Sequence, residues 1–514
     1  MSCLIVLKIG GSCRCSHVVR FFLFFLAGLC VFELQAEAND LIKIYPGDLP
    51  IVLSAPHGGS LEIKGVPERK GQDVKRFVRT KDMWTDQLTV KLADSIEKRT
   101  GKRPYVVVAN FHRKFIDANR SADLAYESPE AKPVYDAYHR AIAAARREVL
   151  QRWGRGMLFD VHGQAAEAKA IFRGTQNGQT TSHLVGKFGQ EALSGEKSVF
   201  GLFAKESIAV IPDLGPEHRE TRYTGGYIVR TYGSSSGGAM DAIQLEFGRQ
   251  LRSLENIDET ARKVANAIVE FSQKYLPEKE LTKEEIVERK KGQGIRVGVY
   301  QDIGSGRSLV DLLETLKKFD DVTVQKLMAA DIQAGSLTDV DVLIHPGGSG
   351  GKQGRNLGEA GREKIRRFLH DGGGFIGICA GAYLASADYS WSLDILDAKV
   401  IDRKHWARGT GTVVIGLSEE GFLKSDQEEL KIFYGQGPLL APGNKVDIED
   451  YHAVATFKTE IAKNGAPKGV MVGTTAIAQG KFGQGRVVCF SPHPEMTEGL
   501  DDLVRQAIEH VRRQ

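Results

Sequence analysis

One stretch decides the fold of the C-terminal half: Gly374-Phe375-Ile376-Gly377-Ile378-Cys379-Ala380-Gly381. An apolar run typical of a buried strand leads directly into a cysteine that is flanked by small residues. Small neighbours are needed where a strand turns sharply into a helix, because the backbone at the turn is tightly bent. The amides that open the next helix favour a thiolate and can hold an oxyanion. The stretch therefore predicts a candidate nucleophile, Cys379, in an α/β fold.

A second segment, far downstream, supplies the partners that such a thiol needs. Ser491-Pro492-His493-Pro494-Glu495 contains a candidate base, His493, and a carboxylate, Glu495, that would orient its imidazole. Together with Cys379 these residues are typical of a Cys-His-Glu triad. The alternative for Cys379 is a small apolar residue packed under a turn, as unpaired cysteines often are.

The surrounding sequence indicates an open, mostly parallel sheet. Strand-like runs at 295–300, 340–344 and 374–377 alternate with helical patterns near 309–319 and 359–370. In such sheets ligands bind at the carboxyl ends of the strands. His345-Pro346-Gly347-Gly348 lies at one of these ends, where glycines let a backbone amide approach a ligand, although glycine turns are also common there without any function.

These motifs carry a resemblance. Residues 295 to 514 resemble the class I glutamine amidotransferase-like superfamily and, more narrowly, the amino-terminal domain of certain biotin-protein ligases. The narrower likeness depends on His345 to Gly348, Gly377 to Tyr383, and Tyr434-Gly435-Gln436-Gly437-Pro438. It implies a flavodoxin-like domain in which Cys379 attacks an amide carbon.

The same resemblance assigns the other roles in that domain. His493 would carry the proton, Glu495 would hold the imidazole, and the amides of Gly348 and Ala380 would receive the oxyanion. The chain has neither a synthetase domain to accept ammonia nor a glycine- and arginine-rich biotin-binding motif. Hydrolysis and simple ligand binding therefore both stay open for this half.

In the N-terminal half, two histidines follow apolar strands. His57 ends the run Ile51 to Gly59, and His162 lies in Phe159-Asp160-Val161-His162-Gly163-Gln164. Imidazole nitrogens suit zinc, and a catalytic zinc site typically adds a carboxylate and keeps one position for water. Asp82 and Asp86 are the candidate third ligands, and the sequence does not decide between them. Each histidine alone would be an ordinary hydrogen-bonded turn residue.

Two arginines and a glutamate further along the chain are the other candidate site residues of the N-terminal half. Arg113 and Arg120 lie on either side of Asp117, an arrangement suited to the capture of a substrate carboxylate or to pairing with Asp117 itself. Glu246 lies in a strand-like run, where it could serve as the general base or as a structural hydrogen-bond acceptor.

Residues of about 45 to 275 resemble the N-formylglutamate amidohydrolase family, which is related in architecture to zinc carboxypeptidases. The likeness depends on His57-Gly58-Gly59, Asp117-Ala118-Asn119-Arg120, Asp160-Val161-His162-Gly163 and Gln244-Leu245-Glu246. It implies metal-dependent hydrolysis of an amide near a carboxylate. His57, His162 and an aspartate would be ligands, Glu246 the base, and Arg113 and Arg120 substrate-binding residues.

The chain of 514 residues is too long for a single core and suggests two domains. We expect a signal peptide at residues 1–38, because Lys8, Arg14 and Arg20 precede the short apolar run 21–32 and a small-x-small site, Ala36-Glu37-Ala38. A membrane anchor would need a longer run. We assign the two domains to residues 40–275 and 295–514, with a charged linker at 276–294.

Composition limits the partners. The 69 basic and 65 acidic residues give a net charge of +4, which offers no broad attraction for nucleic acid. Four of six cysteines lie in the leader, so the mature chain keeps only Cys379 and Cys489, which argues against a disulfide framework but leaves one pairing open. We expect a small-molecule amide or carboxylate substrate and no stable membrane span; the oligomeric state is not indicated.

The combined expectation is an exported hydrolase, periplasmic or secreted, that acts on non-peptide carbon-nitrogen bonds. A metal-dependent, zinc-containing domain for N-acyl amino acids would precede an amidotransferase-like domain with a cysteine nucleophile. The alternative is a non-catalytic protein that binds an amino-acid or cell-wall metabolite with two degenerate enzyme folds, since function resides in sites and not in folds.

Overall fold

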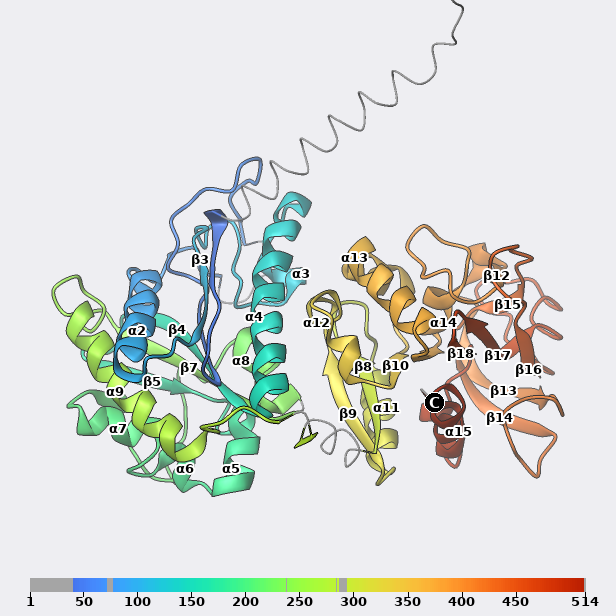
Figure 1. The fold of residues 1–514 in the computed structure, drawn as a ribbon. Coiled ribbons are helices and arrows are strands. Elements are labelled where there is room, and N and C mark those ends of the chain that lie inside the picture. The colour runs from blue at the N-terminus through green and yellow to red at the C-terminus, as the bar shows by residue number, and fades with distance from the viewer. Residues whose placement is uncertain (1–39, 72–76, 237, 283, 286–293, 513–514) are drawn as a thin grey trace, which may run out of the picture.

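The computed structural model describes residues 40–71, 77–236, 238–282, 284–285 and 294–512. The expected signal peptide at 1–38 and much of the expected linker at 276–294 lie outside these residues. Two sheets form the framework, one in each half, and the sequence-based expectation of an α/β protein is confirmed (Figure 1). In the described part of the chain, no helix has the length and apolarity that a membrane span requires.

The N-terminal sheet has seven strands in the order β1-β3-β2-β4-β7-β5-β6. Its centre, β3-β2-β4-β7, is parallel, whereas β1 and β5 run antiparallel to their neighbours β3 and β7. The strands are β1 (Ile42–Tyr45), β2 (Ile51–Ala55), β3 (Tyr105–Ala109), β4 (Gly156–Gln164), β5 (Ala170–Gly174), β6 (Ala209–Ile211) and β7 (Met240–Gly248).

Helices cover both faces of this sheet, which explains why its central strands are buried along almost their whole length. Along β2, Ile51 and Leu53 join the core under α2, α7 and α9, while Val52 joins the opposite core under α4 and α8. The helices are α2 (Thr85–Thr100), α3 (Ala122–Ala125), α4 (Lys132–Trp153), α5 (Ser182–Phe188), α6 (Glu191–Ser194), α7 (Val199–Lys205), α8 (Tyr227–Tyr232) and α9 (Ile257–Tyr275).

The C-terminal sheet has eleven strands, and its parallel part follows the order β9-β8-β10-β11-β18. Numbered along the chain, this is the order 2-1-3-4-5 of flavodoxin-like folds. The strands are β8 (Ile295–Tyr300), β9 (Val322–Leu327), β10 (Val342–His345), β11 (Gly374–Ile378), β12 (Ala398–Ile401), β13 (Thr410–Leu417), β14 (Glu429–Gly435), β15 (Leu439–Pro442), β16 (His452–Phe457), β17 (Thr475–Phe482) and β18 (Gly485–Phe490).

Two helical layers enclose the parallel part of this second sheet. On one side, α11 and α15 pack on β8, β10 and β11; on the other, α12, α13 and α14 pack on the opposite face. These helices are α11 (Ser308–Lys317), α12 (Ala329–Gln333), α13 (Gly350–His370), α14 (Ala380–Ala385) and α15 (Asp501–Val511). The expected flavodoxin-like order and the strand that precedes Cys379 are therefore both present.

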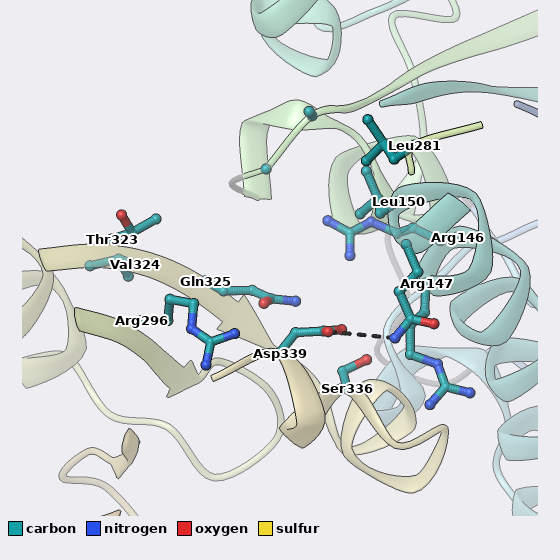
Figure 2. Close-up of a pocket in the computed structure, with 13 residues that line it drawn as sticks. Arg146, Arg147, Leu150, Leu281, Arg296, Thr323, Val324, Gln325, Ser336 and Asp339 are labelled. Atoms are coloured by element: carbon teal, nitrogen blue, oxygen red, sulfur yellow. Dashed lines mark hydrogen bonds between the residues drawn. The ribbon is translucent and has the colours of Figure 1, made fainter. Parts of the chain in front are cut away.

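The two halves meet along α4, which lies between the first sheet and α12 (Figure 1). Met328 and Ala330 of the C-terminal half join the apolar core around α4. Arg140 donates to Gln333 across the contact, with 3.0 Å between nitrogen and oxygen. Figure 2 shows a cavity at one end of the same contact, lined by arginines of α4 and by β8 and β9, where Asp339 accepts a hydrogen bond of 3.5 Å from Gln151.

Candidate metal centre and candidate thiol site

Three side chains of the N-terminal half converge on one point. His57 follows β2, His162 lies in β4, and the two strands are parallel neighbours, so both imidazoles lie at the carboxyl edge of the sheet. Asp82 lies in the turn before α2. Among the described residues, one ligand atom from each of His57, Asp82 and His162 lies within 4.8 Å of the others, and all three residues are buried. Two imidazoles and one carboxylate form a donor set that suits zinc.

The backbone fixes Asp82 in this cluster. Its amide donates to the carbonyl of His57 at 2.9 Å, and its carboxylate accepts from the amide of Gly163 at 3.0 Å. Asp86, the alternative that the sequence left open, lies in the first turn of α2 and does not belong to the cluster. Of the two candidates, only Asp82 is therefore placed to act as a ligand.

A carboxylate behind each histidine orients the ring. The Nε2–H of His57 donates to Asp117 at 2.7 Å, and that of His162 donates to Asp160 at 2.8 Å. Both Nδ1 atoms therefore face Asp82, at 3.5 Å and 3.4 Å from its Oδ2. Such outer carboxylates fix the tautomer of metal-binding histidines.

The charges around the cluster favour a bound cation. Nδ1 of His57 is a buried nitrogen without a hydrogen-bond partner among the described residues, as expected of an atom whose lone pair is reserved for a metal. Burial opposes ionisation of Asp82, but its contacts with His162 and His57 outweigh burial and hold its pKa far below the usual range. For His162, burial alone would lower the pKa of the imidazole, but the carboxylate of Asp160 outweighs burial and raises this pKa well above its ordinary value.

Both arginines pair with Asp117. Arg113 lies 2.9 Å from its Oδ2 and Arg120 lies 3.3 Å from the same oxygen. Arg113 also approaches Asp82, at 3.6 Å. Although burial opposes the charge on Asp117, His57 and Arg113 outweigh it and lower the pKa of that carboxyl strongly. Arg113 and Arg120 still line the cavity at the cluster, so their substrate-binding role stays a prediction beside this structural one.

Glu246 lies on β7, the strand that pairs in parallel with β4. In this pairing Glu246 lies directly opposite His162. The side chain lines the same cavity, of about 650 Å³, as the three candidate ligands. Burial raises its pKa above the ordinary value, although His162 opposes that shift. A carboxyl group whose pKa is raised toward neutrality is suited to exchange protons during a reaction.

Asp117→Asn is expected to weaken zinc binding by about 10- to 100-fold, because His57 loses the charged acceptor that fixes its ring and Arg113 loses its counter-ion. The apparent Kd for zinc should be measured by competition with a chromogenic chelator. Asp258→Asn, a change at an exposed aspartate that pairs with Lys91, serves as the matched control. An unchanged Kd in Asp117→Asn would show that His57 does not depend on this carboxylate.

The second candidate site lies at the end of β11. Cys379 has φ 49° and ψ −94°, a conformation that residues with side chains rarely adopt, and the residue is only 5% exposed. Its neighbours must be small: a Cβ on Gly377 would lie 2.5 Å from Gly381, and one on Gly381 would lie 2.2 Å from the carbonyl of His345. The tight turn that the sequence indicated at Cys379 is present.

The imidazole of His493 reaches this turn from a distant segment. Its Nδ1–H donates to Glu495 at 2.8 Å. Burial would lower the pKa of His493, but the interactions with Cys379 and Glu495 raise it to about 10. Glycines make room for the ring, since a Cβ on Gly435 would lie 2.6 Å from its Nε2 and one on Gly347 would lie 2.7 Å from its Cε1. The structure thus brings the three predicted triad residues together.

The remaining predicted residues lie around the same thiol. Ala380 opens α14 directly after Cys379, and Gly348, with φ 137°, lies in the neighbouring loop after β10. Their oxyanion role stays a prediction. The two cysteines left open as a pair are both free. Burial raises the pKa of Cys489, which lies in β18 as a core residue.

Sequence reasoning missed the roles of several residues. Asp117 and Asp160 lie inside motifs that were singled out, but their positions behind His57 and His162 depend on the fold. For Asp160 a signal existed, because a residue two positions before His162 lies on the same face of a strand. Gly435 was part of a quoted motif, and its contact with His493 emerges only from the three-dimensional arrangement.

Comparison with known proteins gives a partial assignment. Residues 295–422 match the family model described as biotin-protein ligase, N terminal. This range includes Cys379 and Gly348 but ends before His493 and Glu495. A search of curated proteins gave no match.

Several solved structures are similar in part. An N-formylglutamate amidohydrolase from Ralstonia eutropha is 15% identical, with 46% of this chain and 98% of that chain covered and a TM-score of 0.34. A glutamine amidotransferase from Thermotoga maritima is 17% identical, with 42% and 81% covered and a TM-score of 0.27. A ThuA-like protein from Bacteroides uniformis is 14% identical, with 41% and 89% covered and a TM-score of 0.29. At these values the likeness bears on neither the chemistry nor the ligands of this chain.

Proposed function

We propose that the N-terminal half is a zinc-dependent amidohydrolase that acts on N-acyl amino acids. The observation that carries this proposal is the convergence of His57, Asp82 and His162 at one wall of a cavity that also contains Glu246. The buried, unpartnered Nδ1 of His57 and the mixed nitrogen and oxygen donors fit zinc. A bound zinc ion would supply Lewis acidity toward an amide carbonyl and toward water.

Other residues of the N-terminal half would transfer the proton, bind the substrate and position the two histidines. Glu246 accepts a proton from the attacking water and returns it to the departing amine, a role that its raised pKa supports. Arg113 and Arg120 place positive charge at the cavity wall, which favours a substrate with a carboxylate near the scissile amide. Asp117 and Asp160 hold the two imidazoles in place.

For the C-terminal half, the proposed reaction is the hydrolysis of a carboxamide. The Cys379 sulfur forms a bond to the carbonyl carbon, the carbon-nitrogen bond breaks, and the thiol proton passes through His493 to the leaving amine. Water then cleaves the thioester with His493 as base. The contact of His493 with both Cys379 and Glu495 supports this order of events. The leader expected at residues 1–38 supports the further proposal that the protein is exported.

One experiment distinguishes the proposed activities of the two halves. The full chain, loaded with zinc, should be offered a panel of N-formyl and N-acetyl amino acids and, separately, glutamine. A chelator is expected to abolish hydrolysis of the N-acyl compounds and to leave release of ammonia from glutamine intact, while iodoacetamide does the reverse. Hydrolysis of N-acyl amino acids that persists in metal-free protein would overturn the metal-dependent assignment.

A further inference from the structure

A second cavity, of about 570 Å³, lies between the two halves and adjoins the one at the metal cluster. Ser121 and Arg230 line both cavities, so the two spaces are neighbours at these residues. A simple N-formyl or N-acetyl amino acid would occupy only part of the combined space, because cavities of roughly 300 to 1,000 Å³ hold drug-sized ligands.

The lining of this interdomain cavity comes from both halves and is rich in cations. Arg230 belongs to α8, Lys326 to β9 and Lys352 to the first turn of α13. Among the residues that the structure describes, no ion pair engages any of these three side chains. Since unpaired cations around one cavity attract anions, the lining indicates an anionic ligand.

The acidic groups of the lining do not cancel this charge. Asp123 is exposed, and Asp302 is half-buried with its carboxylate already occupied. The amides of Ile303 and Ala329 donate to Asp302 at 2.8 Å and 3.1 Å, and Asn356 donates at 2.9 Å. Burial raises the pKa of Asp302, which reduces its negative charge near neutral pH.

The position of the cavity in the fold also favours a binding role. Gln301 and Lys326 lie at the carboxyl ends of β8 and β9, the edge at which open α/β sheets bind ligands. The cavity of Figure 2 lies at the opposite ends of these strands, and two of its arginines, Arg146 and Arg296, are already engaged. There, Arg296 pairs with Asp341 at 2.5 Å and Arg146 donates to the carbonyl of Tyr232 at 3.1 Å.

We propose that the interdomain cavity binds the distal, anionic part of an extended substrate whose N-acyl amide lies at the metal cluster. This inference rests on the proposed function and narrows its substrate class to acylated acidic peptides and similar polycarboxylates. Lys326 and Lys352 then act as specificity residues, supplied to the N-terminal site by the C-terminal half. Lys326 is half-buried and has no counter-ion in the described parts of the chain, and its desolvation lowers its pKa, so an anionic ligand would offset that cost.

Two probes of different length test the proposal: N-acetyl-L-glutamate and N-acetyl-L-glutamyl-L-glutamate, with binding measured by calorimetry and hydrolysis by kcat/KM. In the double variant Lys326→Gln/Lys352→Gln, affinity for the longer probe is expected to fall about tenfold, equivalent to about 1.4 kcal/mol. Affinity for the shorter probe should stay within about twofold, because it does not reach the two lysines. Lys364→Gln, on the exposed side of the same helix α13, is the matched control.

The outcomes separate this inference from the proposed function. A selective loss for the longer probe supports the interdomain site. An equal loss for both probes, or none, overturns it. If wild-type protein hydrolyses neither probe, the proposed function fails, whereas calorimetry with the two probes still decides whether the lysines bind the distal carboxylates.

Discussion

His162→Ala is expected to abolish stoichiometric zinc binding and N-acyl hydrolysis together. The change removes one of the two imidazoles of the cluster, and with it the partner of Asp160 and a close neighbour of Asp82. Loss of a ligand should exceed the roughly 10- to 100-fold effect of losing an outer-shell partner. Metal content by plasma mass spectrometry, with kcat/KM on the same samples, measures both effects.

A partly exposed histidine outside the cluster provides the control for that variant. His183 lies on α5 near Asp241 and does not belong to the cluster, so His183→Ala should keep full zinc content and activity. His57→Ala should reproduce the loss seen with His162→Ala, which guards against a folding defect at one position. Retention of one zinc per chain in both cluster variants would contradict the assignment of the metal site.

In the mature chain without residues 1–38, Cys379→Ala is expected to eliminate labelling by iodoacetamide and to lower carboxamide hydrolysis by on the order of 10⁴-fold or more, since loss of a nucleophile removes the whole covalent route. Cys489 is fully buried in β18, so it should not contribute to labelling of the native protein. Cys489→Ala is therefore the matched control, with unchanged labelling. Measurement combines mass spectrometry of the labelled protein with ammonia release from glutamine.

A glycine at the same position tests whether the strained turn serves the thiol. Cys379 has a positive φ, which costs of the order of 1–3 kcal/mol for a residue with a side chain. Cys379→Gly should relieve this strain, so its Tm should equal or exceed that of Cys379→Ala while the activity stays absent. A lower Tm for the glycine variant would favour a packing role for the side chain.

The sequence predicted the α/β fold and most of the residues that the structure brings together in the two candidate sites, because these depend on local signals. Strand ends followed by histidine, the small residues around Cys379 and the His493-Pro494-Glu495 segment are each visible in short windows. The parallel order of the strands then brings such ends to one edge of a sheet, which is why distant motifs converge.

Other features of the two sites depend on contacts between residues that are far apart in the sequence, so no short sequence segment reveals them. The choice of Asp82 over Asp86 follows from the turn that hydrogen-bonds Asp82 to His57. Arg113 and Arg120 looked equally suited to a substrate carboxylate and to Asp117, and the structure places both on Asp117. The interdomain cavity is lined by residues of both halves, so no property of either half alone could indicate it.

The most direct test of the metal centre is X-ray absorption at the zinc edge on the full chain after reconstitution with zinc. We predict one zinc per chain with a first shell of nitrogen and oxygen at about 2.0–2.2 Å, including two imidazoles. A shell that contains sulfur at about 2.3 Å, or protein that binds no stoichiometric zinc, would contradict it.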